Sequence, residues 1–168
     1  MALEATSRSL KLPLSLTGPV DVAHLGRELE LIDSSYQQAE LRHTKLADPA
    51  TSPLLAELLE LNQLSLVQSA DRALASQFLV WLTKTAPDVH ISFASNPSAN
   101  FTKKLLTWLR TNISPFLLVS VGLEPAIAAG CVIRTTNKSF DLSLRQRFQD
   151  SRHLIVEALR QTIEDHNP

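Results

Sequence analysis

Histidine, cysteine and glycine-rich loops are the features of this sequence that could support catalysis or hold a cofactor. The five histidines show no metal-ligand spacing on one helical face, and none lies close in sequence to the single cysteine, Cys131. Neither a G-x-x-x-x-G-K-[ST] phosphate loop nor a G-x-S-x-G nucleophile motif is present. We therefore predict a protein that is not an enzyme and that uses no cofactor and no metal ion.

The composition is that of a globular protein able to bury a core. Of the 168 residues, 44% are hydrophobic and 20% charged, with a formal net charge of −1. This balance disfavours nucleic-acid binding driven by phosphate attraction, which requires a basic excess. No apolar run reaches the ~18 residues needed to cross a bilayer, and the N-terminus does not resemble a secretory signal. We expect a soluble protein whose membrane association passes through a partner.

Five basic residues toward the C-terminus are the remaining polar feature. They could dock an acidic partner helix or RNA, or they could neutralise Asp141, Asp150 and solvent-facing positions. The sequence leaves these interpretations open. The five residues are Arg134, Lys138, Arg145, Arg147 and Arg152.

Residues 1–87 are expected to form an N-terminal helical domain. Leucines alternate with polar residues over 10–17, which suits an edge strand or an extended arm within 1–18. Amphipathic spacing then predicts three helices. The first begins at Pro19 and runs for about six turns, the second begins after the Ser52 cap, and the third covers residues 69–85. Such stripes more often form core than contact surface. The stripe of the first helix comprises Val22, Leu25, Leu29, Ile32 and Tyr36.

Residues 88–168 are expected to form a small α/β domain with a mixed sheet. Strands are predicted over 89–93, 116–121 and 129–135, with a helix after the first strand and a short fourth strand after a turn at 136–138. A final helix begins near Ser143, where Gln146 completes a capping box. The complete fold class is therefore α+β. The seam of the final helix comprises Leu144, Phe148, Ile155, Leu159 and Ile163.

One ordered set of motifs in this second domain resembles a known family. Glu124-Pro125 precedes the small pair Ala129-Gly130, a Val132-Ile133-Arg134 strand follows, and Asp141-x-Ser143-Leu144-Arg145 opens the last helix. This order is similar to the C-terminal domain of the delta subunit of F-type ATP synthases, which is related to the oligomycin-sensitivity-conferring protein. The resemblance covers roughly residues 88–163, less than half of the chain.

The resemblance implies a stator subunit that performs no chemistry itself. Delta subunits join the catalytic α/β hexamer to the b-type peripheral stalk, so the expected partners are these two assemblies. The expected location is peripheral, on the cytoplasmic side of the cell membrane through the complex, with no nucleic acid bound. The residues implied to face the stalk are Phe140, Arg145, Ile155, Leu159 and Ile163.

The N-terminal half departs from the family pattern. Family members open with a Tyr-Ala-x-Ala-Leu-Phe type of helix in a six-helix domain, whereas only three helices are predicted here. The candidate substitute for docking to the hexamer is the stripe of Leu25, Leu29, Ile32 and Tyr36.

Two other interpretations remain open. One is the E-type stalk subunit of V-type ATPases. Pro49 and Pro53 argue against this interpretation, because they interrupt what would be one long helix. The other is a small RNA-binding α/β protein. It would use Lys103, Lys104, Arg134 and Arg145.

Overall fold

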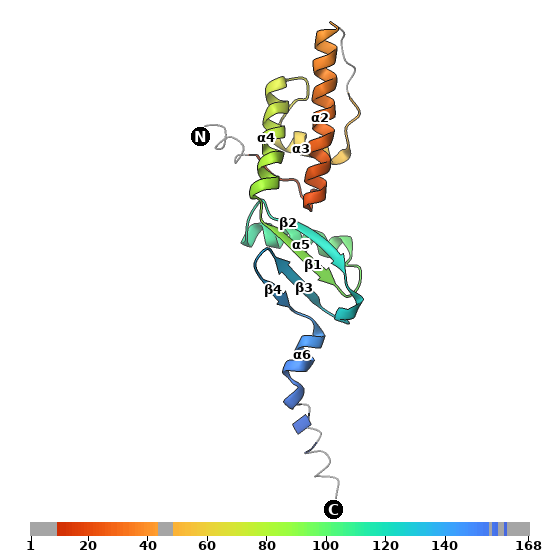
Figure 1. Ribbon diagram of the computed structural model, residues 1–168, viewed down its shortest axis with the longest axis vertical. Helices are drawn as coiled ribbons and strands as arrows, with labels where there is room; N and C mark the ends of the chain where they lie inside the picture. The colour runs from red at the N-terminus through yellow and green to blue at the C-terminus, as the bar shows by residue number, and fades with distance from the viewer. Residues whose placement is uncertain (1–9, 44–48, 155, 158–159, 161–168) are drawn as a thin grey trace, which may run out of the picture. The chain divides into compact units, whose positions relative to one another are not determined.

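The computed structural model describes residues 10–43, 49–154, 156–157 and 160 (Figure 1). It combines helices with a four-stranded mixed sheet, which confirms the predicted α+β class. The elements are α2 (Pro19–Leu41), α3 (Pro53–Asn62), α4 (Ser69–Thr85), β1 (Asp88–Phe93), α5 (Ala99–Asn112), β2 (Leu118–Leu123), the 3₁₀ turn η1 (Pro125–Ile127), β3 (Cys131–Thr135), β4 (Ser139–Asp141) and α6 (Leu144–Asp150).

The chain divides into two compact units. Unit 1 comprises residues 1–88 and 100–119, and unit 2 comprises residues 89–99 and 120–168. The sequence interpretation placed one boundary between residues 87 and 88, whereas α5 belongs to unit 1 although it follows β1 in the chain. The local sequence does not indicate that α5 packs with unit 1, because this packing depends on contacts between residues far apart in sequence.

Unit 1 has its core around the buried face of α2, which packs against α4. Asp21 fixes the start of α2 by accepting hydrogen bonds from the backbone amides of Thr17 and Gly18, both at 3.0 Å. The Ser52 hydroxyl caps α3 by accepting from the Leu55 amide at 3.2 Å, as the sequence predicts. The largest fully buried side chains of this core include Phe78, Leu25, Leu29, Leu55, Leu58 and Leu82.

The segment before α2 forms no strand over its described residues and packs on unit 1 as an arm. Arg110 of α5 holds it, because its guanidinium donates to the carbonyl oxygens of Pro13 at 2.8 Å and Leu16 at 2.5 Å. The same group also donates to the Leu117 carbonyl at 3.2 Å. Burial lowers the pKa of Arg110 to about 10, so the side chain stays charged at neutral pH. The arm is therefore tied to the fold by a buried cation that binds backbone acceptors.

The sheet has the strand order β2-β1-β3-β4 (Figure 1). β1 and β3 are antiparallel, with Phe93 opposite Cys131, and β3 and β4 are antiparallel, with Arg134 opposite Ser139. Pro87 accepts from the Leu118 amide and Phe93 accepts from the Glu124 amide, so β1 and β2 advance in the same direction. β1 and β2 thus form a parallel pair, and β2 begins two residues later than predicted.

The final helix differs from the continuous one predicted from the seam. α6 ends at Asp150, Ser151 adopts φ −96° and ψ 5°, and helical backbone resumes at residue 152. Asp and Ser compete with helical hydrogen bonding through their own side chains, which favours an interruption at this pair. Of the predicted seam, Ile155, Leu159 and Ile163 lie outside the described residues.

Candidate partner-binding surface

The described part of the chain has no cluster of three His, Cys, Asp or Glu side chains placed to hold a metal ion. The thiol of Cys131 is partly buried in β3, and burial raises its pKa. A raised pKa lowers the fraction of reactive thiolate at neutral pH. Within residues 10–43, 49–154, 156–157 and 160, no helix has the length and apolar character required to span a membrane. The candidate functional features of the described residues are surfaces.

Several of the residues that carry the family resemblance meet at a joint between β3 and α6. Gly130 has φ +95°, a conformation that L side chains rarely adopt. A Cβ atom there would lie 2.5 Å from the Leu142 carbonyl oxygen and 3.0 Å from the Ser143 Cα atom. The Leu144 amide donates to the Ala129 carbonyl at 2.8 Å. The segment that leads into α6 thus passes directly over Gly130, which explains why a residue without a Cβ atom stands there.

Asp141 and Ser143 complete this joint by capping α6. The Ser143 hydroxyl accepts from the Gln146 amide at 3.2 Å, which confirms Ser143 as the N-cap. The second half of the predicted capping box is wrong, because Gln146 donates its side-chain amide to Asp150 at 3.0 Å. The Ser143 amide donates instead to Asp141 Oδ1 at 2.8 Å, and hydrogen bonding from Ser143 lowers the pKa of Asp141.

An exposed apolar surface begins at this joint, which we call the α6 surface. α6 has no buried residue, and its Phe148 side chain is 56% exposed. Phe140 on β4, predicted as a contact residue, is 50% exposed, and the predicted Arg145 is also exposed. Sequence reasoning did not select Leu142 or Leu154. The apolar members of the surface are Phe140, Leu142, Leu144, Phe148, Leu154 and Val156, and its exposed arginines are Arg145, Arg147 and Arg152.

The stripe of α2 that was predicted as a possible docking face lies inside unit 1. Leu25 and Leu29 are 1% and 2% exposed, and Ile32 is also buried. Tyr36 is partly buried against the same core, with the Arg72 guanidinium 4.6 Å from its ring centroid. Because these side chains are covered by the chain itself, they belong to the core of unit 1 rather than to a docking face.

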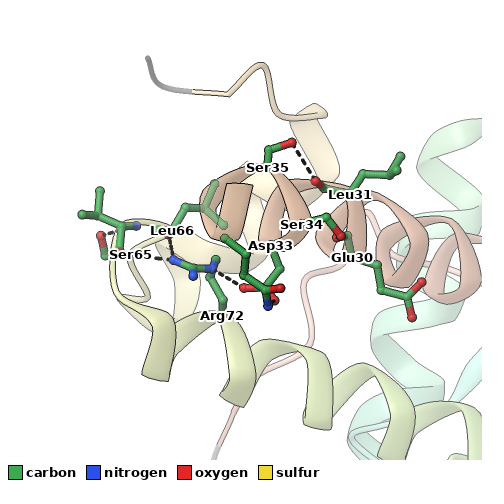
Figure 2. Close-up of polar contacts among 10 residues, drawn as sticks. Glu30, Leu31, Asp33, Ser34, Ser35, Ser65, Leu66 and Arg72 are labelled. Carbon is green, nitrogen blue, oxygen red and sulfur yellow. Dashed lines mark hydrogen bonds and ion pairs between the residues drawn. The ribbon is translucent and has the colours of Figure 1, made fainter. Parts of the chain in front are cut away.

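A groove between α2 and α4 is a second feature of unit 1, and Figure 2 shows Arg72 and Asp33 of its lining. Its volume is about 560 Å³. Arg72, almost fully buried, donates to Asp33 at 2.6 Å and to the carbonyl oxygens of Leu66 and Val67 at 2.8 and 3.2 Å. The lining residues are Leu29, Glu30, Asp33, Gln37, Glu40, Ser69, Arg72, Ala73, Ser76 and Gln77.

The sequence analysis missed this groove, although the sequence carries one signal of it. Arg72 is in register with the buried residues Ala75, Leu79 and Leu82 of α4, so a charged residue occupies the apolar stripe. A long cationic side chain on a core face requires an acceptor nearby, which here is the partly exposed Asp33. The identity of that acceptor depends on the packing of α2 against α4.

Comparison of the sequence with protein-family models and with curated proteins finds no match.

Proposed function

We propose that this chain is a non-catalytic stator subunit of a rotary ATPase, similar in role to the delta subunit of F-type ATP synthases. The observation that carries the proposal is the joint at Gly130. Three motif residues of the resemblance have a local physical task there, since Gly130 admits the segment that leads into α6, and Asp141 and Ser143 hold the start of that helix. The order of β3, β4 and α6 also agrees with the strand, return strand and helix start on which the resemblance rests.

In this role the α6 surface binds the stalk. Apolar residues that stay exposed on a helix with no buried residue are a recognised mark of protein contact surfaces. The arginines beside them favour a partner helix that carries carboxylates next to an apolar seam. Such a helix is what we propose for the b-type stalk subunit. Truncating a central apolar anchor of this kind costs about 2 kcal/mol of binding.

The remaining parts of the proposal concern the assembly. The α/β hexamer is the second partner. One part of the chain binds the hexamer and the other binds the stalk, so that the chain resists twisting between the hexamer and the stalk. In this proposal Ile155, Leu159 and Ile163 also contact the stalk. Membrane association then occurs only through the complex, on the cytoplasmic side of the cell membrane.

Affinity capture of the tagged full chain from native membranes tests the proposal. We expect the rotary ATPase catalytic and stalk subunits to be recovered together with the chain. The double variant Leu144→Asp/Phe148→Asp should lose the stalk subunit, because it places charge on the apolar surface. The matched control is Leu31→Asp, which alters an exposed apolar residue of α2 and should leave recovery unchanged.

Two results would overturn this function. One is recovery of ribosomes in place of ATPase subunits, with RNA binding that weakens steeply as salt is raised. The other is unchanged proton-driven ATP synthesis in cells whose chain stops after Gln149. The second result counts against the proposal, because the truncation removes Leu154 and Val156 together with the proposed contacts Ile155, Leu159 and Ile163.

A further inference from the structure

Two side chains from distant parts of unit 1 hold the arm, residues 10–17, by its backbone. The Asn62 side chain accepts from the Lys11 amide at 2.6 Å and donates to the Lys11 carbonyl at 3.0 Å, as a residue on a neighbouring strand does. The almost fully buried Arg110 donates to two further carbonyl oxygens of the arm. These two partners stand 51 to 97 positions away in the sequence. We call the surface that binds the arm through Asn62 and Arg110 the arm site.

The apolar side chains of the arm enter the core at every third position. Leu10 and Leu16 are 8% and 0% exposed, and Pro13 is fully buried. Lys11 and Leu14, which follow the first two of these residues, are exposed. Hydrogen bonds to the backbone combined with burial of spaced side chains are the means by which proteins bind extended peptides. The arm site therefore recognises an extended segment with apolar residues at these three positions.

The link between the arm and the rest of unit 1 is a single residue. Thr17 ends the arm, and its carbonyl accepts from the Val119 amide at 2.7 Å. α2 begins at Pro19, which leaves Gly18 as the link. Short links of this kind favour the exchange of the attached segment between identical chains. The contacts within the arm site do not depend on this link, because the residues that form them are distant from it in sequence.

We propose that the arm site accepts the arm of a second copy of this chain, so that two chains exchange arms and form a dimer. The occupant is a second copy because its arm is the segment that the structure shows to fit the site. The exchanged dimer keeps the contacts of the arm with Asn62 and Arg110, and changes the path of the chain around Gly18. A short tether gives its own arm an effective concentration of about 1 mM, so exchange requires copies that are concentrated or held side by side.

Crosslinking between chains tests the exchange. The Ser15 hydroxyl of the arm donates to the Glu57 carboxylate of α3, and both residues are exposed. One chain carries Ser15→Cys and a differently tagged chain carries Glu57→Cys, each together with Cys131→Ser. The two chains are refolded together from urea at about 1 mM, so that slow release of the arm cannot prevent exchange, and are treated with a short bismaleimide.

Exchange predicts a specific product of this reaction. Mixed dimers should exceed the self-crosslinked dimers of either chain several-fold, because the exchanged arm places Ser15→Cys of one chain beside Glu57→Cys of the other. The same two substitutions on one chain should give an internal crosslink in the monomer at low concentration. Circular dichroism verifies that each variant is folded. Mixed dimers no more abundant than self-crosslinked dimers would overturn the proposal, because chance collisions produce both kinds equally.

The length of the link gives a second test. Inserting Gly-Ser-Gly-Ser after Gly18 should lower the yield of mixed dimers several-fold, because a longer link lets each arm reach the site on its own chain without constraint. The matched control places the same insertion between Ser95 and Asn96, exposed residues of unit 2, and should leave the yield unchanged. Equal yields from the two insertions would show that the dimer does not form by exchange through Gly18.

The exchange is independent of the stator role, because it concerns unit 1, whereas the α6 surface belongs to unit 2. Leu144→Asp/Phe148→Asp should leave the yield of mixed dimers unchanged. The crosslinking experiments use the purified chain alone, so their failure would not alter the capture of partners from membranes.

Discussion

Helices α2 and α6 carry the same kind of amphipathic sequence pattern but differ in the burial of their apolar side chains. In α2 the apolar stripe is buried, and Leu25, Leu29 and Ile32 all belong to the core of unit 1. In α6 no residue is buried, although Leu144 and Phe148 are spaced as on an amphipathic helix. The comparison teaches that apolar spacing predicts a helix and its apolar face, but does not predict what covers that face.

The largest test of this comparison replaces one phenylalanine in each region. Phe78→Ala in unit 1 should lower the free energy of unfolding by about 3–5 kcal/mol, because it leaves a cavity in a packed core. Phe148→Ala on α6 should change it by less than about 0.5 kcal/mol. Urea denaturation followed by circular dichroism measures both. A cost above about 1 kcal/mol for Phe148→Ala would mean that α6 is covered in solution and would break the comparison.

Glycine substitutions give the next largest expected difference. Gly130→Ala should destabilise unit 2 by about 2 kcal/mol, because the residue has φ +95° and its Cβ atom would contact the Leu142 carbonyl. Gly26→Ala within α2 meets no neighbouring atom within 4 Å and should stabilise its helix by about 0.5–1 kcal/mol. Hydrogen exchange of the Leu144 amide reports the joint. Unchanged exchange in Gly130→Ala would show that α6 does not depend on this close approach.

Two arginines sharpen the contrast between interior and surface. Arg110→Met should cost about 2 kcal/mol, because hydrogen bonds from a buried charged group to the Pro13, Leu16 and Leu117 carbonyls are lost. Arg134→Met removes an exposed pair with Glu124 at 3.8 Å and should cost less than about 0.5 kcal/mol. Fluorescence follows the first variant well, since Trp81 and Trp108 both belong to unit 1. Similar costs for the two variants would contradict the role of Arg110 as the tie for the arm.

The smallest expected effect is the acid sensitivity of the joint. Hydrogen bonding from Ser143 lowers the pKa of Asp141 in the folded chain, so the carboxylate form stabilises the fold. This stabilisation is present at neutral pH and is lost as the pH falls through the lowered pKa. Hydrogen exchange of the Ser143 amide should therefore become less protected in acid relative to other amides. In Asp141→Ala the same amide should be less protected at neutral pH, and an unchanged protection would refute the assignment.

Local signals allowed much of the fold to be predicted. Ser52 and Ser143 are identified as N-caps from residue type and position, and the structure has both. Strand β1 follows its apolar alternation, strand β3 follows its apolar run, and the two strands pair as neighbours. The partial capping box at Gln146 shows the limit of this reasoning, because Asp141 competes successfully for the Ser143 amide. Two acceptors within reach of one donor cannot be ranked from spacing alone.

Most element types, the serine caps and the need for a small residue at Gly130 can be read from the amino-acid sequence, because these features depend on atoms within a few residues of one another. Tertiary structure alone decided that Arg110 binds the Pro13 carbonyl, 97 positions away, and that α2 is covered while α6 is not. Burial depends on contacts between segments that are distant in sequence, and the sequence of one helix does not specify which other segment packs against it. The groove beside Arg72 arises in the same way, from the packing of α2 against α4.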